Sequence, residues 1–223
     1  MTSPKTTTAP VGVCVWDIPR YAHYMVSYPQ YVHEILGHAG LCYESVAPAD
    51  LLARLPHLRL LLTIGECEPP AALREQLAAW VERGGAWLSV GGVCGLASLF
   101  GVQVEPAAYR LYGFASNLGE GYLRTDTVQH PILGHITLPL HYFNGISVLP
   151  AGGQVLASVL NAHQRPTPRA ALVENSAGRG RVFVVEHGVA GLSGPDQSRR
   201  IPAARDSTRD HLARISGRAG GTI

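Results

Sequence analysis

The chain has 223 residues, of which 46% are hydrophobic and 15% charged, and its formal net charge at pH 7 is +2. This composition predicts a globular domain with extensions and excludes fibrous and disordered classes. Basic residues do not cluster with aromatic ones in the body of the chain, which argues against nucleic-acid binding. No apolar run is long enough to cross a membrane and the first ten residues are polar, so we expect a cytoplasmic protein without membrane contact.

The four cysteines and the two ends of the chain add further expectations. Cys14, Cys42, Cys67 and Cys94 are widely spaced without a Cys-x-x-Cys pair, which favours reduced thiols. We interpret residues 1–9 as a disordered tail, 10–192 as one domain and 193–223 as an extension. That extension holds six arginines and three aspartates, and Ser207 could cap a short helix at 207–215.

Strands and helices are predicted to alternate in the first half of the domain. Continuous apolar runs, typical of buried parallel strands, occur at 11–16, 41–46, 58–64 and 86–90. Helical spacing predicts helices over 28–38, from Pro48 and Asp50 onward, and from Pro69-Pro70 to the stop at Gly84-Gly85. This order predicts an α/β fold in which helices cover both faces of a parallel sheet.

The second half is predicted to be rich in β-structure. Short alternating segments at 121–124, 146–149 and 154–160 are expected to form β-rich insertions and returning strands. A hairpin turn in the segment Gly178-Arg179-Gly180-Arg181 is expected to lead into a last strong strand at 180–186.

The segment 86–101 is the most informative part of the sequence. A strand leads into Gly91-Gly92, Cys94 follows on the turn, and a short apolar helix is expected after it. This order can present a nucleophile at the edge of a parallel sheet, with a helix N-terminus lowering the pKa of the thiol. Alternatively, Cys94 is a buried structural thiol, because free cysteine is among the most buried residue types.

Several motifs together resemble the class I glutamine-amidotransferase-like superfamily. They are Val81-Glu-Arg-Gly-Gly85, the Gly-Gly-x-Cys turn, His130-Pro131-Ile132 and the run from Gly178 to Phe183. The resemblance covers roughly residues 10–192 and is nearest to ThuA-like and carbohydrate-enzyme-associated branches. It implies a flavodoxin-like doubly wound parallel sheet with its site at the carboxyl ends of the strands.

The same resemblance implies catalytic positions, which this chain matches only in part. It implies Cys94 as nucleophile, His187 as base, Glu186 as candidate acid, and an oxyanion site at the Gly65 amide. Leu96 stands where the superfamily keeps a small residue, and Glu186 precedes His187, so the two point to opposite faces. These departures predict that the chain is not a glutaminase.

Ligand-binding residues are expected at the same strand ends. Asp17 and Tyr21 follow the first strand. An aromatic ring with a polar tip, such as that of Tyr21, suits a sugar ligand. Tyrosine would also be expected in a packing loop or a dimer interface. Glu66 and Glu68 follow the third strand, where they could act as acid and base or favour the next helix N-terminus. Backbone groups at Gly65, Gly92 and Gly95 complete the candidate ligand site.

The remaining candidate is a histidine cluster, which leads to no metal assignment. His130, His135 and His141 could meet at a metal ion, but their spacing fits no known ligand pattern, and we expect neither metal nor cofactor.

Three functions remain open. The first is a degenerate amidotransferase-like protein that binds a small polar, carbohydrate-derived ligand. The second is a cysteine-dependent hydrolase or amidotransferase that uses Cys94 and His187, with oxyanion donors at Gly65 and Gly95. The third is a non-catalytic assembly module that self-associates. A reactive Cys94 would favour the second hypothesis, and ligand-induced stabilisation with an inert Cys94 would favour the first.

Overall fold

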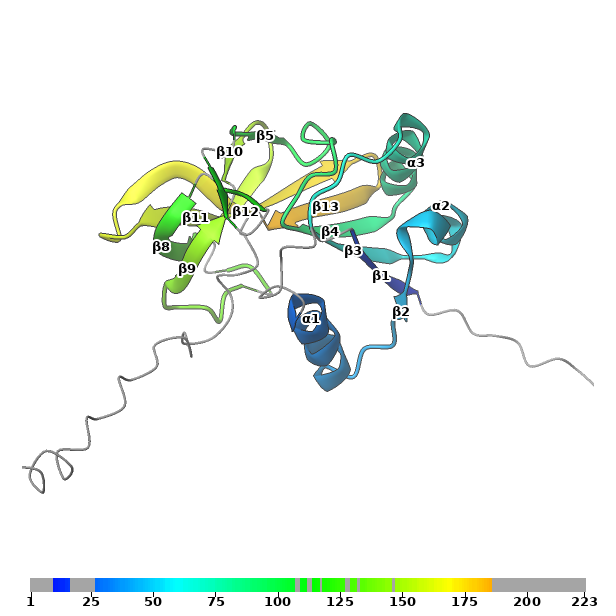
Figure 1. Cartoon of the computed structure of the whole chain (residues 1–223), viewed down its shortest axis with the longest axis horizontal. Helices are drawn as coiled ribbons and strands as arrows, with labels where there is room; N and C mark the ends of the chain where they lie inside the picture. Colours follow the sequence, from blue (N-terminus) through cyan, green and yellow to red (C-terminus); the bar gives the residue numbers. More distant parts are fainter. Residues whose placement is uncertain are drawn as a thin grey trace, which may run out of the picture. The chain divides into compact units, whose positions relative to one another are not determined.

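A computed structural model describes residues 10–16, 27–106, 109–111, 114–116, 118–126, 129–131, 133–145 and 147–185 (Figure 1). The chain divides into two units, Met1–Leu192 and Ser193–Ile223, and every described residue belongs to the first. The predicted tail at 1–9, the extension 193–223 and its helix at 207–215 lie outside the described residues and stay predictions.

One half of the main sheet consists of parallel strands that lie side by side in the order β2-β1-β3-β4-β13. Apart from the two-residue strand β2, these are short, mainly apolar and largely buried segments, as predicted for strands covered by helices. Their bounds are β1 Val11–Val15, β2 Glu44–Ser45, β3 Leu60–Ile64, β4 Ala86–Val90 and β13 Gly180–Val185.

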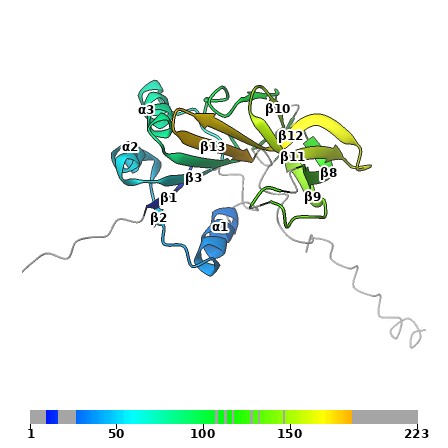
Figure 2. The ribbon, with the colours of Figure 1, turned by 180° about the vertical axis from the view of Figure 1, so that it is seen from behind.

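Helices cover both faces of this parallel half (Figures 1 and 2). The helix α1, Ser27–His38, packs Val32 and Leu36 against a core cluster on one face. The helices α2, Leu51–Arg54, and α3, Ala71–Glu82, contribute apolar side chains to the larger core cluster on the other face. Short 3₁₀ turns, η1 Pro48–Asp50 and η2 Leu55–His57, flank α2. Gly84, at φ +116°, ends α3 because L side chains rarely adopt this backbone conformation.

The second half extends the same sheet with antiparallel strands. A turn at Gly178 and Arg179 joins β12 to β13, and the sheet continues as β12-β11-β8-β9. These strands are β8 Leu118–Thr125, β9 Leu140–Gly145, β11 Gln154–Asn161 and β12 Pro166–Ala177. The short strands β5 Val102–Val104 and β10 Val148–Pro150 pair beside β12, and β6 Tyr109–Leu111 forms a separate hairpin with β7 Phe114–Ser116.

The fold is therefore α/β, with a large sheet that is mixed and few helices. The parallel half, the β-rich second half and the hairpin turn at 178–179 are confirmed. The expected doubly wound parallel sheet with β-rich insertions does not describe the whole, because the second-half strands join the sheet antiparallel. Within the described residues, no helix is long and apolar enough to cross a membrane.

Two local predictions are wrong. The strand expected over 41–46 contains only Glu44 and Ser45. The apolar helix expected after Cys94 is absent, because residues 94–101 form successive turns instead. Cys94, Gly95 and Gly101 all have positive φ, which a right-handed helix cannot accommodate.

Candidate functional site

The carboxyl ends of β1, β3, β4 and β13 meet at one edge of the sheet. Three backbone hydrogen bonds join the ends in turn: Trp16 N–H donates to Ile64, Gly65 N–H to Val90 and Gly91 N–H to Val185, at 3.0, 2.8 and 2.8 Å. Side chains that follow these strands are thereby held side by side, as at other parallel-sheet sites. Four of the predicted site residues, Asp17, Tyr21, Glu186 and His187, lie outside the described residues, so their roles stay predictions.

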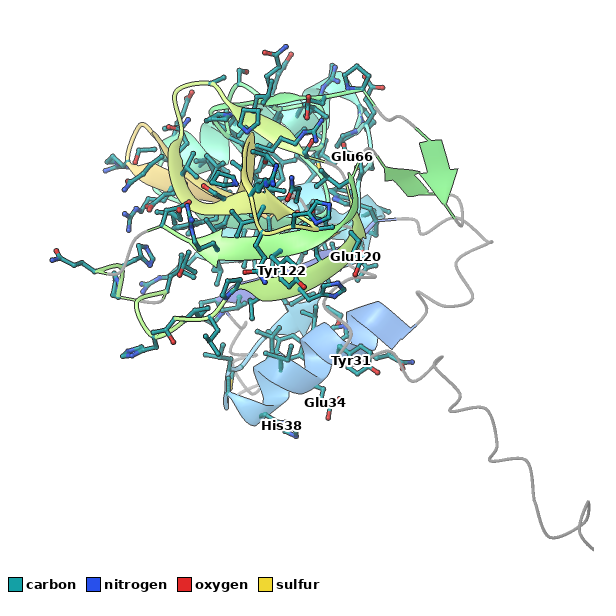
Figure 3. All side chains as sticks on the ribbon, turned by 90° about the vertical axis from the view of Figure 1, so that its left-hand side faces the viewer. Tyr31, Glu34, His38, Glu66, Glu120 and Tyr122 are labelled. Atoms are coloured by element: carbon teal, nitrogen blue, oxygen red, sulfur yellow. The ribbon has the colours of Figure 1, made fainter. Side chains whose placement is uncertain are left out.

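Glu66 reaches from the end of β3 to the turn that follows β4. The backbone N–H of Val93 donates to Glu66 Oε2 at 2.5 Å, and the N–H of Cys94 donates to the same carboxylate. Gly92 allows this approach, because a Cβ at that position would lie 2.7 Å from the Glu66 Cα and would overlap its carboxylate. Figure 3 shows Glu66 apart from Tyr31, Glu34 and His38, which belong to α1. The amides of the turn are therefore occupied by a carboxylate of the chain itself.

The environment of the Glu66 carboxylate raises its pKa above the ordinary value of 4.5. Burial of the carboxylate is the main cause, and the negative charge of Glu68 adds to it, whereas the bonds from Val93 and Cys94 oppose it. The residue as a whole remains exposed to solvent, although its carboxylate lies against the backbone of the turn. A carboxylate in this position can accept a hydrogen bond from a ligand or exchange a proton with it.

Cys94 lies on the turn in the left-handed conformation, at φ 51°, and its side chain is fully buried. A side-chain hydrogen bond with Cys67, burial, and the charges of Cys67 and Glu66 together raise the pKa of Cys94 above that of a free thiol. The lowered pKa expected from a helix N-terminus is not found, because residues 94–101 form no helix.

The other residues around the turn differ in part from the expected oxyanion site. The Gly65 N–H donates to the Val90 carbonyl within the sheet, so this amide is already used. At Gly95, the guanidinium of Arg74 lies 3.0 Å from where a Cβ would stand, and Arg74 also pairs with Glu68 at 3.3 Å. The side chain of Leu96 packs against the main core.

The alternative of an acid–base pair at Glu66 and Glu68 is not favoured by their partners. Glu66 contacts the amides of the turn, whereas Glu68 pairs with Arg74. Nor does either residue cap α3, whose N-cap is Pro70 and has no side-chain hydrogen bond.

A chain of buried hydrogen bonds supports the turn from beneath. Trp87 Nε1 donates to Thr63 Oγ1 at 2.9 Å, and Thr63 Oγ1 donates to Ser89 Oγ at 2.9 Å. Ser89 Oγ then donates to the Gly92 carbonyl at 2.6 Å. Sequence reasoning missed this chain, although a signal was present: a hydroxyl residue is the penultimate member of each of two otherwise apolar neighbouring strands.

Trp16 is a second residue that sequence reasoning missed. It follows β1 beside Gly65, and only 4% of its surface is exposed. Within the part of the chain that the structure describes, its indole Nε1 is buried and has no hydrogen-bond partner. A buried donor of this kind is costly unless a ligand or water satisfies it. The sequence pattern counted Trp16 as the last apolar residue of the predicted strand at 11–16, and it gave no sign that the indole N–H would lack a partner.

The histidines of the second half do not form a common site. His130 Nε2 lies 3.9 Å from Oε2 of buried Glu174, which is also paired with Arg181. His141 Nε2 lies 2.9 Å from Oε1 of Glu120, and Glu120 belongs to β8, which also carries Tyr122 (Figure 3). His135 is exposed. Among the described residues, no group of three or more histidine, cysteine, aspartate or glutamate side chains is arranged to hold a metal ion.

No family model and no curated protein matches this sequence. Solved structures do resemble the fold. The β-galactosidase of Rahnella sp. R3 is 17% identical with a TM-score of 0.58, over 81% of this chain and 29% of that chain. A cytoplasmic protein of Salmonella typhimurium is 11% identical with a TM-score of 0.57, over 80% and 87%. A ThuA-like protein of Bacteroides uniformis is 11% identical with a TM-score of 0.53, over 86% and 87%.

At these identities the comparisons establish the fold alone. The chain shares a ThuA-like fold, as the sequence motifs implied. It spans less than a third of the β-galactosidase and most of the two smaller proteins.

Proposed function

We propose that this chain binds a small polar, carbohydrate-derived ligand at the carboxyl ends of β1, β3 and β4 and has no glutaminase activity. The observation that carries the proposal is the contact of the Glu66 carboxylate with the amides of Val93 and Cys94. A cysteine hydrolase needs free amide donors where the oxyanion develops. Here the Gly65 amide already donates to the Val90 carbonyl, and the Glu66 carboxylate that contacts the Val93 and Cys94 amides would repel an oxyanion formed beside Cys94.

The state of Cys94 supports the same conclusion. The thiolate is the nucleophilic form of cysteine, and catalytic cysteines have a lowered pKa in a partly exposed environment. Cys94 is buried, hydrogen-bonded to Cys67 and close to the charge of Glu66, and all three features favour its neutral form.

The chemistry of the strand ends suits a hydroxylated ligand. The indole N–H of Trp16 can donate to a ligand hydroxyl, and the carboxylate of Glu66 can accept from one. The predicted residues Asp17 and Tyr21 follow Trp16 within five positions of the sequence and would add an acceptor and an aromatic surface. We further propose that the parallel half is a flavodoxin-like core, whose ligand sites lie at this edge of the sheet. The likeness to β-galactosidase structures suggests a sugar as the first ligand class to test.

One observation favours the alternative of a cysteine-dependent hydrolase. Cys94 has φ 51°, and a nucleophile on a strand-to-helix turn is held in such a strained backbone conformation. The two functions differ in the expected reactivity of this thiol.

Alkylation by iodoacetamide distinguishes the two functions. The rate at each cysteine of the native protein is followed against pH by mass spectrometry. We expect exposed Cys42 to react quickly and Cys94 only when the protein unfolds, while buried Cys14, whose pKa burial raises to about 12, serves as an unreactive reference. Rapid alkylation of Cys94 near neutral pH would instead support the hydrolase.

Ligand binding is tested by thermal shift and calorimetry with galactose, mannose and their acid derivatives. We expect Trp16→Phe to weaken binding of the best sugar about tenfold, the loss of one hydrogen bond of about 1.4 kcal/mol. Trp80→Phe is the matched control, because Trp80 Nε1 donates to the Leu58 carbonyl at 3.3 Å within the core. No stabilisation by any of these compounds, or equal losses in both variants, would contradict the proposal.

A further inference from the structure

The side chain of Arg74 places a positive charge on the turn that follows β4. Arg74 is the fourth residue of α3, and its side chain extends to Gly95. A Cβ at Gly95 would lie 3.0 Å from Arg74 Nη1 and 3.4 Å from Arg74 Cδ, so a larger residue there would crowd this side chain. The guanidinium is therefore held against the turn that also contacts Glu66, at the carboxyl ends of the strands.

Arg74 uses only one of its nitrogens within the described part of the chain. Nη1 donates to Oε1 of Glu68 at 3.3 Å, and no other hydrogen bond of the guanidinium is found among the described residues. The side chain of Glu68 is 84% exposed, and ion pairs between exposed groups contribute little to stability. Arginine carries five N–H donors in a planar fork that matches both oxygens of a carboxylate. A ligand carboxylate can therefore take the place of Glu68 and accept two parallel hydrogen bonds instead of one.

The electrostatic surroundings of Arg74 favour an anion beside it. The N-cap of α3, Pro70, makes no side-chain hydrogen bond, and the first turn of α3 holds no acidic residue. The positive end of the helix dipole therefore adds to the charge of Arg74. Glu66 is bound to the Val93 amide, and Glu68 extends into solvent once it is displaced, where ions screen its charge.

A second donor at the strand ends also requires an acceptor. The indole N–H of Trp16 is buried and has no partner in the described part of the chain. Trp16 follows β1 and Arg74 reaches the turn after β4, so the two donors stand at strand ends on either side of β3. Donors of this kind recognise a ligand that is rich in acceptors, and a carboxylate is the strongest acceptor among the common groups of a sugar acid.

We propose that the ligand of this site is an acidic sugar, whose carboxylate binds the Arg74 guanidinium in place of Glu68. This inference rests on the proposed function, because it names the chemical class of the ligand bound there. The indole N–H of Trp16 donates to a hydroxyl or ring oxygen of the same sugar.

Calorimetry with the full-length protein, at fixed pH and ionic strength, compares D-galacturonate with D-galactose, which has a hydroxymethyl group in place of the carboxylate. We expect galacturonate to bind about tenfold more tightly, and Arg74→Gln to abolish this preference without changing the affinity for galactose. Arg83→Gln is the matched control, because it removes the same charge at the opposite end of α3. Glu68→Gln should strengthen binding of galacturonate, since Glu68 no longer competes for the guanidinium.

A nuclear magnetic resonance measurement observes Arg74 directly. The ¹H–¹⁵N signal of Arg74 Nε is identified by its absence from the spectrum of Arg74→Gln. We expect this signal to shift when galacturonate is added and to stay in place when galactose is added.

Several outcomes would overturn this inference while leaving the proposed function intact. They are equal affinities for the two sugars, a preference for galacturonate that persists in Arg74→Gln, and an equal loss of that preference in Arg83→Gln. Tighter binding of galactose 6-phosphate than of galacturonate would also overturn it, because the recognised anion would then not be a carboxylate. Absence of binding by both galactose and galacturonate would contradict the proposed function as well.

Discussion

Glu66 and Val93 are joined by a hydrogen bond of 2.5 Å that links the end of one parallel strand to the turn after the next. The Cys94 amide donates to the same carboxylate, so a single side chain satisfies two successive backbone groups. Such a pair of amides forms an anion-binding site, which this chain fills with its own glutamate. The same feature gives the turn its conformation and makes Cys94 a poor candidate for a thiolate nucleophile.

Glu66→Ala should destabilise the protein by about 1–2 kcal/mol, because both amides lose their charged acceptor and solvent replaces it only in part. Thermal or urea denaturation measures this difference. Glu68→Ala is the matched control, since Glu68 is exposed and its ion pair among the described residues is with Arg74. Equal losses in the two variants would contradict the role of Glu66 in the turn.

Glu66→Gln should become more stable relative to the wild type as the pH rises. Glutamine keeps an acceptor for the Val93 amide but cannot ionise. The folded-state pKa of Glu66 is raised above its unfolded value near 4.5, so the folded wild type binds the proton more tightly. This contribution to stability is fully present below the unfolded pKa and is lost as the pH rises through the folded pKa.

Urea unfolding of both proteins from pH 3.5 to pH 7 tests this prediction. The wild type should lose stability relative to Glu66→Gln between the unfolded and the folded pKa, with no further relative change above that window. A relative gain by the wild type over this range would mean that the amide bonds outweigh burial.

The parallel half could be predicted from the sequence because its signals are local. The strand over 86–90 is an apolar run between two glycine pairs, and the structure reproduces its bounds. The strand β12 was missed because Pro166, Pro168 and several alanines give it a weak β-pattern, and its stability depends on pairing with strands on both sides. Such pairing between distant segments is not written in the local pattern.

The candidate site was predictable in position but not in contacts. Topology alone places Glu66 and Cys94 at neighbouring strand ends. The bond from the Val93 amide and the contact between Cys67 and Cys94 depend on the register of β3 with β4 and on the positive φ of Cys94. Neither the register nor this backbone angle follows from residue type, because φ > 0 is uncommon for any residue other than glycine.

Ser89→Ala should cost about 1–3 kcal/mol, because it removes the donor to the Gly92 carbonyl and leaves the buried hydroxyl of Thr63 without its acceptor. Denaturation of Ser89→Ala, Thr63→Val and the double variant measures the coupling between the two hydroxyls. We expect the second substitution to cost clearly less than the first, since the linked bonds are lost together. Additive losses would show that the hydroxyls act independently.

Gly92→Ala should destabilise the protein by about 2 kcal/mol or more. The added Cβ would lie 2.7 Å from the Glu66 Cα and overlap its carboxylate, so the turn must shift or release Glu66. Gly119→Ala on β8 is the matched control, because nothing lies within 4 Å of a Cβ at that exposed position. There the smaller entropy of the unfolded chain should leave stability unchanged or raise it by up to about 1 kcal/mol.

If Gly92→Ala were as stable as Gly119→Ala, the close approach of Glu66 to the turn would be wrong. If it is destabilised as expected, faster alkylation of Cys94 in the same variant would show that the Glu66 contact also keeps the thiol buried.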